Sequence, residues 1–220
     1  MKYVALDIGN VLVRVNSQRF LNKLSKSLNI SLEEATYFLN RTQKLHDLGY
    51  TKISDELRDH FKIRSSVLIN ELLEEWNYIV QPADYILDIF NNIRQQEPLK
   101  IALLSNIGVE HMALMPQLLG QGDFYDQTIK YFSCQVGARK PSMIYYHTFL
   151  ELYPNFKGCT YIDDLLENLA VGQQFGFKPF HFSLQDIVDH NYEETKYLST
   201  IEKMKNAILD QPEIINCRWH

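Results

Sequence analysis

Three short apolar segments of this chain end in polar side chains that can take part in chemistry. The segments are rich in Val, Ile, Leu or Tyr, which is typical of strands buried on both faces of a parallel sheet. Ligands bind at the carboxyl ends of such strands, where the strand order reverses. We therefore expect the terminal side chains to lie together. The segments and their polar ends are Tyr3–Asp7, Lys100–Ser105 followed by Asn106, and Cys159–Asp163 followed by Asp164.

A lysine and the three carboxylates among these side chains predict a site for a cation and a phosphate. Asp7, Asp163 and Asp164 would repel one another at close range unless a cation neutralised them. Oxygen ligands on few protein groups suit Mg²⁺, which is bound through one or two carboxylates plus substrate phosphate. Lys140 stands just before an expected helix. Its ammonium, together with the Ser105 hydroxyl and loop amides, would form a phosphate receptor.

The elements that must position these residues alternate between strand and helix. Such alternation predicts βαβ units and an α/β fold with a doubly wound parallel sheet. Only 9 Gly and 7 Pro occur among 220 residues, which favours long helices over the many tight turns of an all-β protein. Besides the three segments above, we expect weaker strands at Thr128–Phe132 and Lys178–Phe182, and helices at Ala83–Arg94, Val109–Leu119, Ser142–Tyr153 and Leu165–Phe175.

The stretch between the first two strands is much longer than the roughly 30 residues of a βαβ step. It contains an amphipathic segment, Ser17–Leu28, and a capping box in which Ser31 precedes Glu34. Ser54 is expected to cap a third helix, and Ser65–Tyr78 to form a fourth. We therefore predict a helical cap inserted into an α/β core. The expected division is residues 1–14 and 81–190 for the core, 15–80 for the cap, and 191–220 for a C-terminal helix and tail.

Composition and charge exclude several classes of partner. The formal net charge is -5 and basic residues are scattered, whereas a nucleic-acid surface needs a basic face. No apolar stretch approaches the ~18 residues of a membrane span, and the N-terminus lacks the uninterrupted apolar run of a signal peptide. The three cysteines are odd in number and far apart. The cysteine pattern predicts reduced thiols in a cytoplasmic protein. The charge and the lack of a long apolar stretch predict that neither nucleic acid nor a membrane is a partner.

The polar segments resemble, in order, the motifs of the haloacid dehalogenase (HAD) superfamily of Mg²⁺-dependent phosphohydrolases. The resemblance covers about residues 1–185, and the expected helical insertion is similar to that family's cap of the first type. A dipeptide such as Lys-Pro is common by chance, so the four motifs in order are far more specific than any one. They are Asp7-Ile8-Gly9-Asn10-Val11, Leu103-Leu104-Ser105-Asn106, Arg139-Lys140-Pro141, and the segment from Tyr161 to Asn168 containing Asp163-Asp164.

The resemblance implies a role for each matching residue. Asp7 would be the nucleophile that accepts the phosphoryl group as an aspartyl phosphate. Mg²⁺ would be held by Asp7, the Gly9 carbonyl and Asp164, with Asp163 bound directly or through water. The Ser105 hydroxyl and the Asn106 backbone N–H would bind phosphate oxygens. Lys140 would pair with both Asp7 and the phosphate. The implied activity is phosphatase action on a small phosphorylated metabolite.

Gly9 departs from the family's usual first motif, in which a second Asp acts as general acid and base. The sequence resembles a branch reading D-x-G-N-V, to which sugar-phosphate phosphatases, including one acting on glucose 1-phosphate, are similar. A sugar phosphate is therefore the expected substrate, because an anomeric hydroxyl is a better leaving group than an ordinary alcohol. Otherwise a bound water or a cap residue must replace the acid. His46 and Asp47, in an expected loop His46–Tyr50, are candidates.

Two other functions stay open at this stage. A 2-haloacid dehalogenase would use the same Asp7 to attack carbon without a metal, although the pair Asp163-Asp164 disfavours it. A regulatory protein could keep the phosphate pocket and lose turnover through Gly9.

Overall fold

A computed structural model describes residues 1–120, 123–185 and 194–210. Its centre is a five-stranded parallel sheet with the strand order β5-β4-β1-β6-β7. The chain adds β4 and β5 on one side of β1, and β6 and β7 on the other, so the order reverses between β1 and β6. The predicted α/β doubly wound sheet is confirmed. The strands are β1 Lys2–Leu6, β4 Leu99–Ser105, β5 Ile129–Phe132, β6 Thr160–Asp163 and β7 Lys178–His181.

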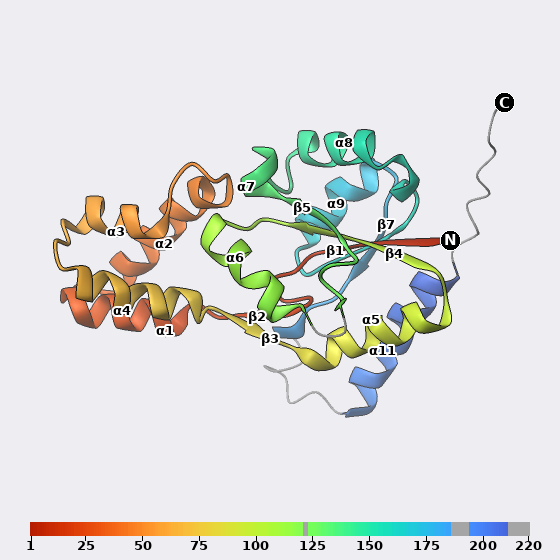
Figure 1. Ribbon diagram of the computed structural model, residues 1–220, viewed down its shortest axis with the longest axis horizontal. Helices are drawn as coiled ribbons and strands as arrows, with labels where there is room; N and C mark the ends of the chain where they lie inside the picture. Colours follow the sequence, from red (N-terminus) through yellow and green to blue (C-terminus); the bar gives the residue numbers. More distant parts are fainter. Residues whose placement is uncertain (121–122, 186–193, 211–220) are drawn as a thin grey trace.

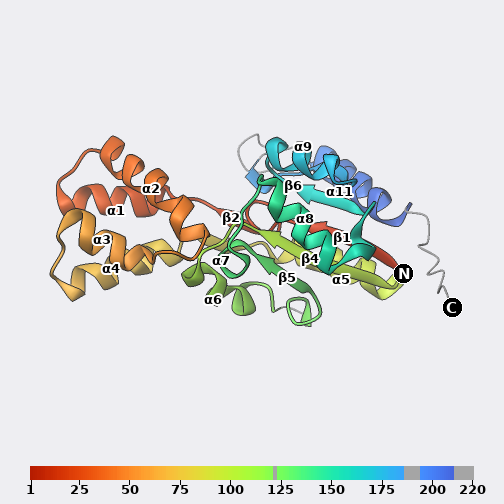
Figure 2. The same ribbon diagram turned by 90° about the horizontal axis from the view of Figure 1, so that it is seen from above.

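Helices cover both faces of this sheet, which Figure 1 shows from the edge and Figure 2 shows face-on. One face packs against α5 (Asp84–Gln96), α6 (Val109–Leu118) and α11 (Glu194–Leu209). The other packs against α8 (Met143–Leu152) and α9 (Leu166–Gln174). Each predicted core helix is present, with its ends within two residues of those expected. The predicted polar helix near the C-terminus is α11, and the expected tail after it lies outside the described residues.

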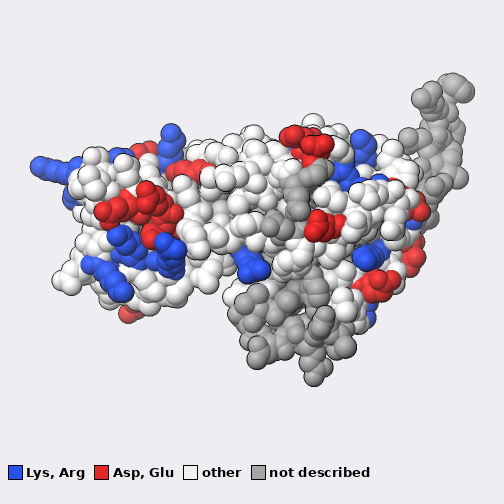
Figure 3. Space-filling model, turned by 60° about the horizontal axis from the view of Figure 1, so that its bottom comes forward, with Lys and Arg blue, Asp and Glu red and all other residues white. Residues whose placement is uncertain are grey.

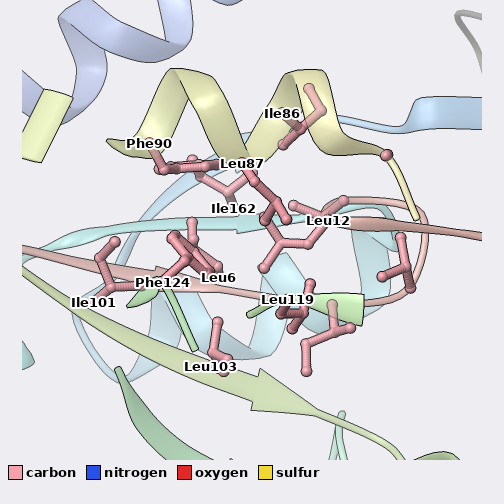
Figure 4. Packing of buried hydrophobic residues seen from close by; sticks show 14 of the residues in the cluster. Leu6, Leu12, Ile86, Leu87, Phe90, Ile101, Leu103, Leu119, Phe124 and Ile162 are labelled. Carbon is pink, nitrogen blue, oxygen red and sulfur yellow. The ribbon is translucent and has the colours of Figure 1, made fainter. Parts of the chain in front are cut away.

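The apolar strands supply both layers of the core because successive side chains point to opposite faces. Leu6 and Ile162 join the cluster under α5, whereas Ala5 and Tyr161 join the cluster under α8. Figure 4 shows Ile86, Leu87 and Phe90 of α5 packed over the strand residues of the first cluster. Burial on both faces fixes the register of β1, and therefore fixes where Asp7 leaves the sheet.

A helical insertion, α1 to α4, projects from the end of the sheet (Figure 1). A two-stranded antiparallel ribbon, β2 Val13–Val15 with β3 Val80–Pro82, joins it to the core. The predicted boundaries at residues 15 and 80 fall on two residues that pair in this ribbon. The insertion has its own apolar cluster, which includes Phe20, Phe38 and Trp76. Its helices are α1 Gln18–Leu28, α2 Leu32–Asp47, α3 Ile53–Phe61 and α4 Ser66–Asn77.

Serine caps begin two of the insertion helices, and the cap at Ser31 was expected. The side chains of Ser31 and Ser65 accept hydrogen bonds from the backbone N–H groups of Glu34 and Leu68. The prediction for Ser54 was wrong. Helix α3 begins at Ile53 after Lys52, so Ser54 lies within its first turn. Here a glutamate from the core, described below, accepts a hydrogen bond from the first backbone N–H and replaces the serine.

Acidic and basic residues lie side by side on the face of the insertion in Figure 3. Arg19 and Lys23 of α1 pair with Glu75 and Glu71 of α4. The positive charges on this face are thus largely matched by nearby carboxylates. Among the described residues, no helix is both long and apolar enough to cross a membrane. Two further short elements are α7 Ser133–Val136 and the 3-10 turn Pro154–Phe156.

Candidate functional site

The three predicted carboxylates meet at the carboxyl ends of β1 and β6, on either side of the point where strand order reverses. Asp7, Asp163 and Asp164 each offer one oxygen, and these oxygens lie within 4.8 Å of one another. Asp7 and Asp163 are buried and Asp164 is partly buried. Parallel pairing of β1 with β6 explains the arrangement, since both strands end at the same edge of the sheet.

Lys140 reaches into this group from the loop before α8. Its Nζ atom lies 2.9 Å from Oδ1 of Asp7 and 2.7 Å from Oδ2 of Asp163. The side chain is only 1% exposed, so the two ion pairs are shielded from water. One ammonium thus bridges two of the three carboxylates. This bridge fixes the position of Asp7 relative to β6.

Asp163 is held by protein donors on both oxygens. Oδ1 accepts hydrogen bonds from the Leu165 backbone N–H and the Asn168 amide, each at 2.9 Å. Oδ2 accepts from the Tyr161 hydroxyl as well as from Lys140. Asp163 therefore has little capacity left for a direct metal bond. The oxygens of Asp7 and Asp164 are more available.

The electrostatics of this group favour binding of a cation. Burial raises the pKa of Asp7 to about 7, with Asp163 and Asp164 adding to the rise and Lys140 opposing it. Burial also raises the pKa of Asp164. For Lys140 burial alone would lower the pKa, but Asp163 and Asp7 outweigh it and raise the pKa above its ordinary value. Three carboxylates and one ammonium leave an excess of negative charge, and the oxygen donors fit a hard divalent ion.

Asn10 orients Asp164 and was missed by the sequence reasoning as a site residue. Its side-chain amide donates to Oδ2 of Asp164 at 3.1 Å, and its side-chain oxygen accepts from the Val15 backbone N–H at 3.1 Å. Asn10 has φ 53, the left-handed conformation that Asn tolerates better than most residues. Its position in the first motif, three residues after Asp7, was the sequence feature that could have indicated a role in the site.

Ser105 and Asn106 end β4 beside the carboxylates. The Asn106 side chain accepts from the backbone N–H of Lys140 at 2.8 Å and donates to the backbone oxygen of Lys140 at 2.9 Å. The amide side chain is thus occupied in joining two loops, which leaves the backbone N–H as the group that could meet a phosphate. Ser105 is 3% exposed and lines the pocket described below.

His46 and Asp47 lie at the end of α2, so the expected loop beginning at His46 was wrong. His46 Nε2 lies 3.0 Å from Oε2 of Glu110 in α6, and its Nδ1 lies 3.8 Å from Oδ1 of Asp47. Oδ2 of Asp47 lies 3.0 Å from the Arg139 guanidinium. The residues form a chain of alternating charge, Glu110–His46–Asp47–Arg139, which we call the junction chain. It ties the insertion to α6, which follows Ser105, and to Arg139, which precedes Lys140.

The junction chain keeps His46 charged. Burial alone would lower the pKa of His46, but Asp47 and Glu110 outweigh it and raise the pKa to about 9. The adjacent His111 has its pKa lowered to about 4, mainly by burial, and its Nε2 lies 2.9 Å from the backbone oxygen of Trp76. Both ring nitrogens of His46 face carboxylates, so the side chain serves to hold the insertion against the core. It is poorly suited to be the replacement acid.

A pocket of about 240 Å³ lies between the core and the insertion, and residues that follow Asp7 and Ser105 in the chain line it. The core contributes Gly9, Ser105 and Asn106, and the insertion contributes one face of α2 together with Trp76. Its volume lies below the usual range of about 300–1,000 Å³ for sites of drug-sized ligands. The pocket suits a small metabolite.

Gly9 lines this pocket where the family motif would put an acid. A Cβ atom built there would lie 3.3 Å from Cγ2 of Val15, so a side chain needs only a small adjustment of its neighbour. The titratable residues that share the pocket are His46, Asp47 and His111. The first two belong to the junction chain, and His111 stacks on Trp76 with ring centroids 4.5 Å apart.

Comparison with known proteins finds the same fold in HAD enzymes. No family model matches the sequence, and no curated protein matches it. The HAD family enzyme bt-2542 of Bacteroides thetaiotaomicron has 19% identity over 88% of this chain and 99% of that chain, with a TM-score of 0.71. It has also been solved in complex with magnesium and inorganic phosphate.

Two further structures extend the comparison. A HAD-like hydrolase of Porphyromonas gingivalis has 19% identity over 93% of this chain and 97% of that chain, with a TM-score of 0.69. An L-2-haloacid dehalogenase of Xanthobacter autotrophicus has 15% identity over 94% and 87%, with a TM-score of 0.55. At such identities the likeness shows a shared fold.

Proposed function

We propose that this chain is a Mg²⁺-dependent phosphatase of the HAD superfamily that hydrolyses a small phosphorylated metabolite, with a sugar phosphate as the best candidate. The observation that supports it most is the convergence of Asp7, Asp163, Asp164 and Lys140 at the reversal of strand order. The fold shared with bt-2542, which was solved with magnesium and inorganic phosphate, adds support. The three carboxylates give the excess negative charge that a divalent cation offsets.

Asp7 is the proposed nucleophile. Its carboxylate attacks phosphorus, the bond from phosphorus to the ester oxygen breaks, and the leaving group departs with that electron pair. Water then hydrolyses the aspartyl phosphate and releases inorganic phosphate. Lys140 holds Asp7 in place by the 2.9 Å ion pair and lowers the cost of bringing a phosphate near it.

Asp7, the Gly9 carbonyl and Asp164 are the proposed ligands of Mg²⁺, with Asp163 acting through water because its oxygens already accept protein hydrogen bonds. When bound, Mg²⁺ would neutralise charge on the transferring phosphoryl group. The Ser105 hydroxyl and the Asn106 backbone N–H are the proposed phosphate donors. The insertion acts as a cap over the pocket.

The proposed location is the cytoplasm. The free thiols of Cys134 and Cys159 support it, because thiols stay reduced in that compartment.

Gly9 leaves the departing oxygen without a carboxylic acid, which makes good leaving groups the preferred substrates. General acid–base catalysis contributes about 10²–10⁴-fold, so an ordinary alcohol ester should react slowly. The rate should fall less for an ester of an anomeric hydroxyl, because this hydroxyl is more acidic than an ordinary alcohol and is a better leaving group. This reasoning supports a sugar 1-phosphate over a phosphate on a primary alcohol.

Phosphate release from p-nitrophenyl phosphate and glucose 1-phosphate tests the proposal. We expect release that requires Mg²⁺ and stops with a chelator and with Asp7→Asn. Chelator-resistant hydrolysis would contradict it.

The two alternatives have distinct readouts. Release of halide from 2-chloropropionate without Mg²⁺ would indicate a 2-haloacid dehalogenase. Gly9 is the observation that favours a regulatory phosphate-binding protein. Stabilisation by Mg²⁺ plus vanadate, without turnover across a panel of phosphate esters, would indicate that function.

A further inference from the structure

One face of α2 forms the wall of the pocket opposite the core. Asn40, Gln43 and His46 line it at a spacing of three residues, which places them on the same side of a helix. The α2 wall faces Gly9 and Ser105 across the pocket. Gly9 follows Asp7 by two residues, so the pocket begins close to the proposed nucleophile.

The charges around the pocket are unfavourable for a second anion. Among the described residues that line it, none is a Lys or Arg. The imidazolium of His46 already faces Glu110 and Asp47, so its charge is matched. Asp47, another residue that lines the pocket, is acidic, and its carboxylate pairs with Arg139. A carboxylate or second phosphate on the substrate would therefore lose water without gaining a cation.

Neutral hydrogen-bonding groups are available instead. Asn40 and Gln43 are exposed to solvent, and their side-chain amides form no hydrogen bond with another residue in the described part of the chain. Trp76, which is 4% exposed and also lines the pocket, has a buried indole N–H without a described partner. Amides both donate and accept hydrogen bonds, which matches a neutral hydroxyl or amide. The Trp76 nitrogen has almost no accessible surface, so the amides of α2 are the groups that a ligand in the pocket can reach.

We propose that Asn40 and Gln43 are specificity-determining residues that select a neutral leaving group bearing hydroxyl or amide functions, and that the pocket rejects leaving groups with a second negative charge. The inference rests on the proposed phosphatase function and narrows its substrate class to monophosphates of uncharged metabolites. Bisphosphates, nucleoside di- and triphosphates and phosphorylated carboxylic acids fall outside that class.

Two aryl phosphates of nearly equal shape provide the test. In 4-carbamoylphenyl phosphate the distal group is a neutral amide, and in 4-carboxyphenyl phosphate it is an anion. We expect kcat/KM with Mg²⁺ to be at least about tenfold higher for the amide ester, a difference of about 1.4 kcal/mol. Gln43→Lys should reduce this ratio at least tenfold, mainly by lowering KM for the carboxylated ester.

Leu45→Lys is the matched control because it adds the same charge to α2 at an exposed position outside the pocket. It should leave the ratio unchanged. Equal kcat/KM for the two esters, or the same shift with both lysine variants, would overturn the specificity inference while the phosphatase function stood. Failure to hydrolyse either ester or p-nitrophenyl phosphate would overturn both.

Discussion

The imidazole Nε2 of His46 lies 3.0 Å from Oε2 of Glu110 and links the last turn of α2 to the first turn of α6. The other oxygen of Glu110 accepts the backbone N–H of Ile53 at 2.8 Å, at the start of α3. One core glutamate therefore holds two insertion helices. The pocket wall formed by α2 is fixed relative to the carboxylates by this contact as well as by the ribbon.

The contact predicts a pH-dependent contribution to stability. The pKa of His46 is raised from 6.5 to about 9, so its contribution is fully present below pH 6.5 and is lost as the pH rises through about 9. The shift corresponds to roughly 3 kcal/mol. Urea unfolding of the wild type and His46→Gln should show a free-energy difference that shrinks by about this amount between about pH 6 and about pH 10.

Glu110→Gln serves as the control for this effect. It retains a side chain of the same size and removes one of the charges that raise the pKa of His46. The pH dependence should be smaller in this variant than in the wild type. A His46→Gln difference that is equal at both pH values would show that His46 is not charged in the native state.

Gly108→Ala tests how closely the junction is packed. A Cβ atom at residue 108 would lie 1.9 Å from Cε1 of His46, so the imidazole would have to move. Overpacking of this kind costs about 1–3 kcal/mol. In a His46→Ala background the same substitution should cost much less, giving a clear coupling energy in a double-mutant cycle. Additive costs in urea unfolding would contradict the packing described for the junction.

Tyr161→Phe tests the support beneath Asp163. Its hydroxyl donates to the Asp163 carboxylate, and bonds to charged groups contribute about 1.5–3 kcal/mol. Tyr145→Phe is the control, since the hydroxyl of this equally buried tyrosine donates to the backbone oxygen of Tyr131. A neutral bond of that kind contributes about 0.5–1.5 kcal/mol. Thermal unfolding should show the larger loss for Tyr161→Phe, and the reverse order would contradict this assignment.

Much of the fold could be predicted because local patterns decided it. Buried parallel strands are short and apolar, and each one near the site ended at a polar residue such as Asp7 or Ser105. The Ser31 cap could be predicted because it depends on residues three apart. The prediction that Ser54 caps α3 was wrong because the Glu110 carboxylate, from a helix distant in sequence, accepts the hydrogen bond at the N-terminus of α3 instead.

The contacts that hold the site together depend on tertiary structure. Asn106 binds the backbone of Lys140, 34 residues away, through a pair of hydrogen bonds that no local pattern indicates. His46 and Asp47 were candidates for the replacement acid because they stand in the expected cap loop. Their ion pairs with Glu110 and Arg139 became evident only once α2 was placed against the core.

Gly9→Asp should restore the acid that this sequence lacks. The Val15 side chain must yield by a few tenths of an ångström to admit the new Cβ. Because acid catalysis matters most for poor leaving groups, we expect turnover of an alkyl phosphate to rise at least about tenfold relative to p-nitrophenyl phosphate. Gly9→Asn is the control, because it adds a side chain of the same size that cannot act as an acid. If Gly9→Asn raises turnover of the alkyl phosphate as much as Gly9→Asp does, proton transfer is not the cause.

Trapping of a phosphorylated Asp7 tests the central claim most directly. Without an acid or base at residue 9, hydrolysis of the aspartyl phosphate should be slow and the intermediate should accumulate. The enzyme is mixed with Mg²⁺ and p-nitrophenyl phosphate, quenched, and reduced with borohydride, which converts an acyl phosphate to homoserine. We predict homoserine at residue 7 by peptide mass spectrometry, absent with chelator. Steady hydrolysis that leaves residue 7 unmodified and persists in Asp7→Asn would contradict the account.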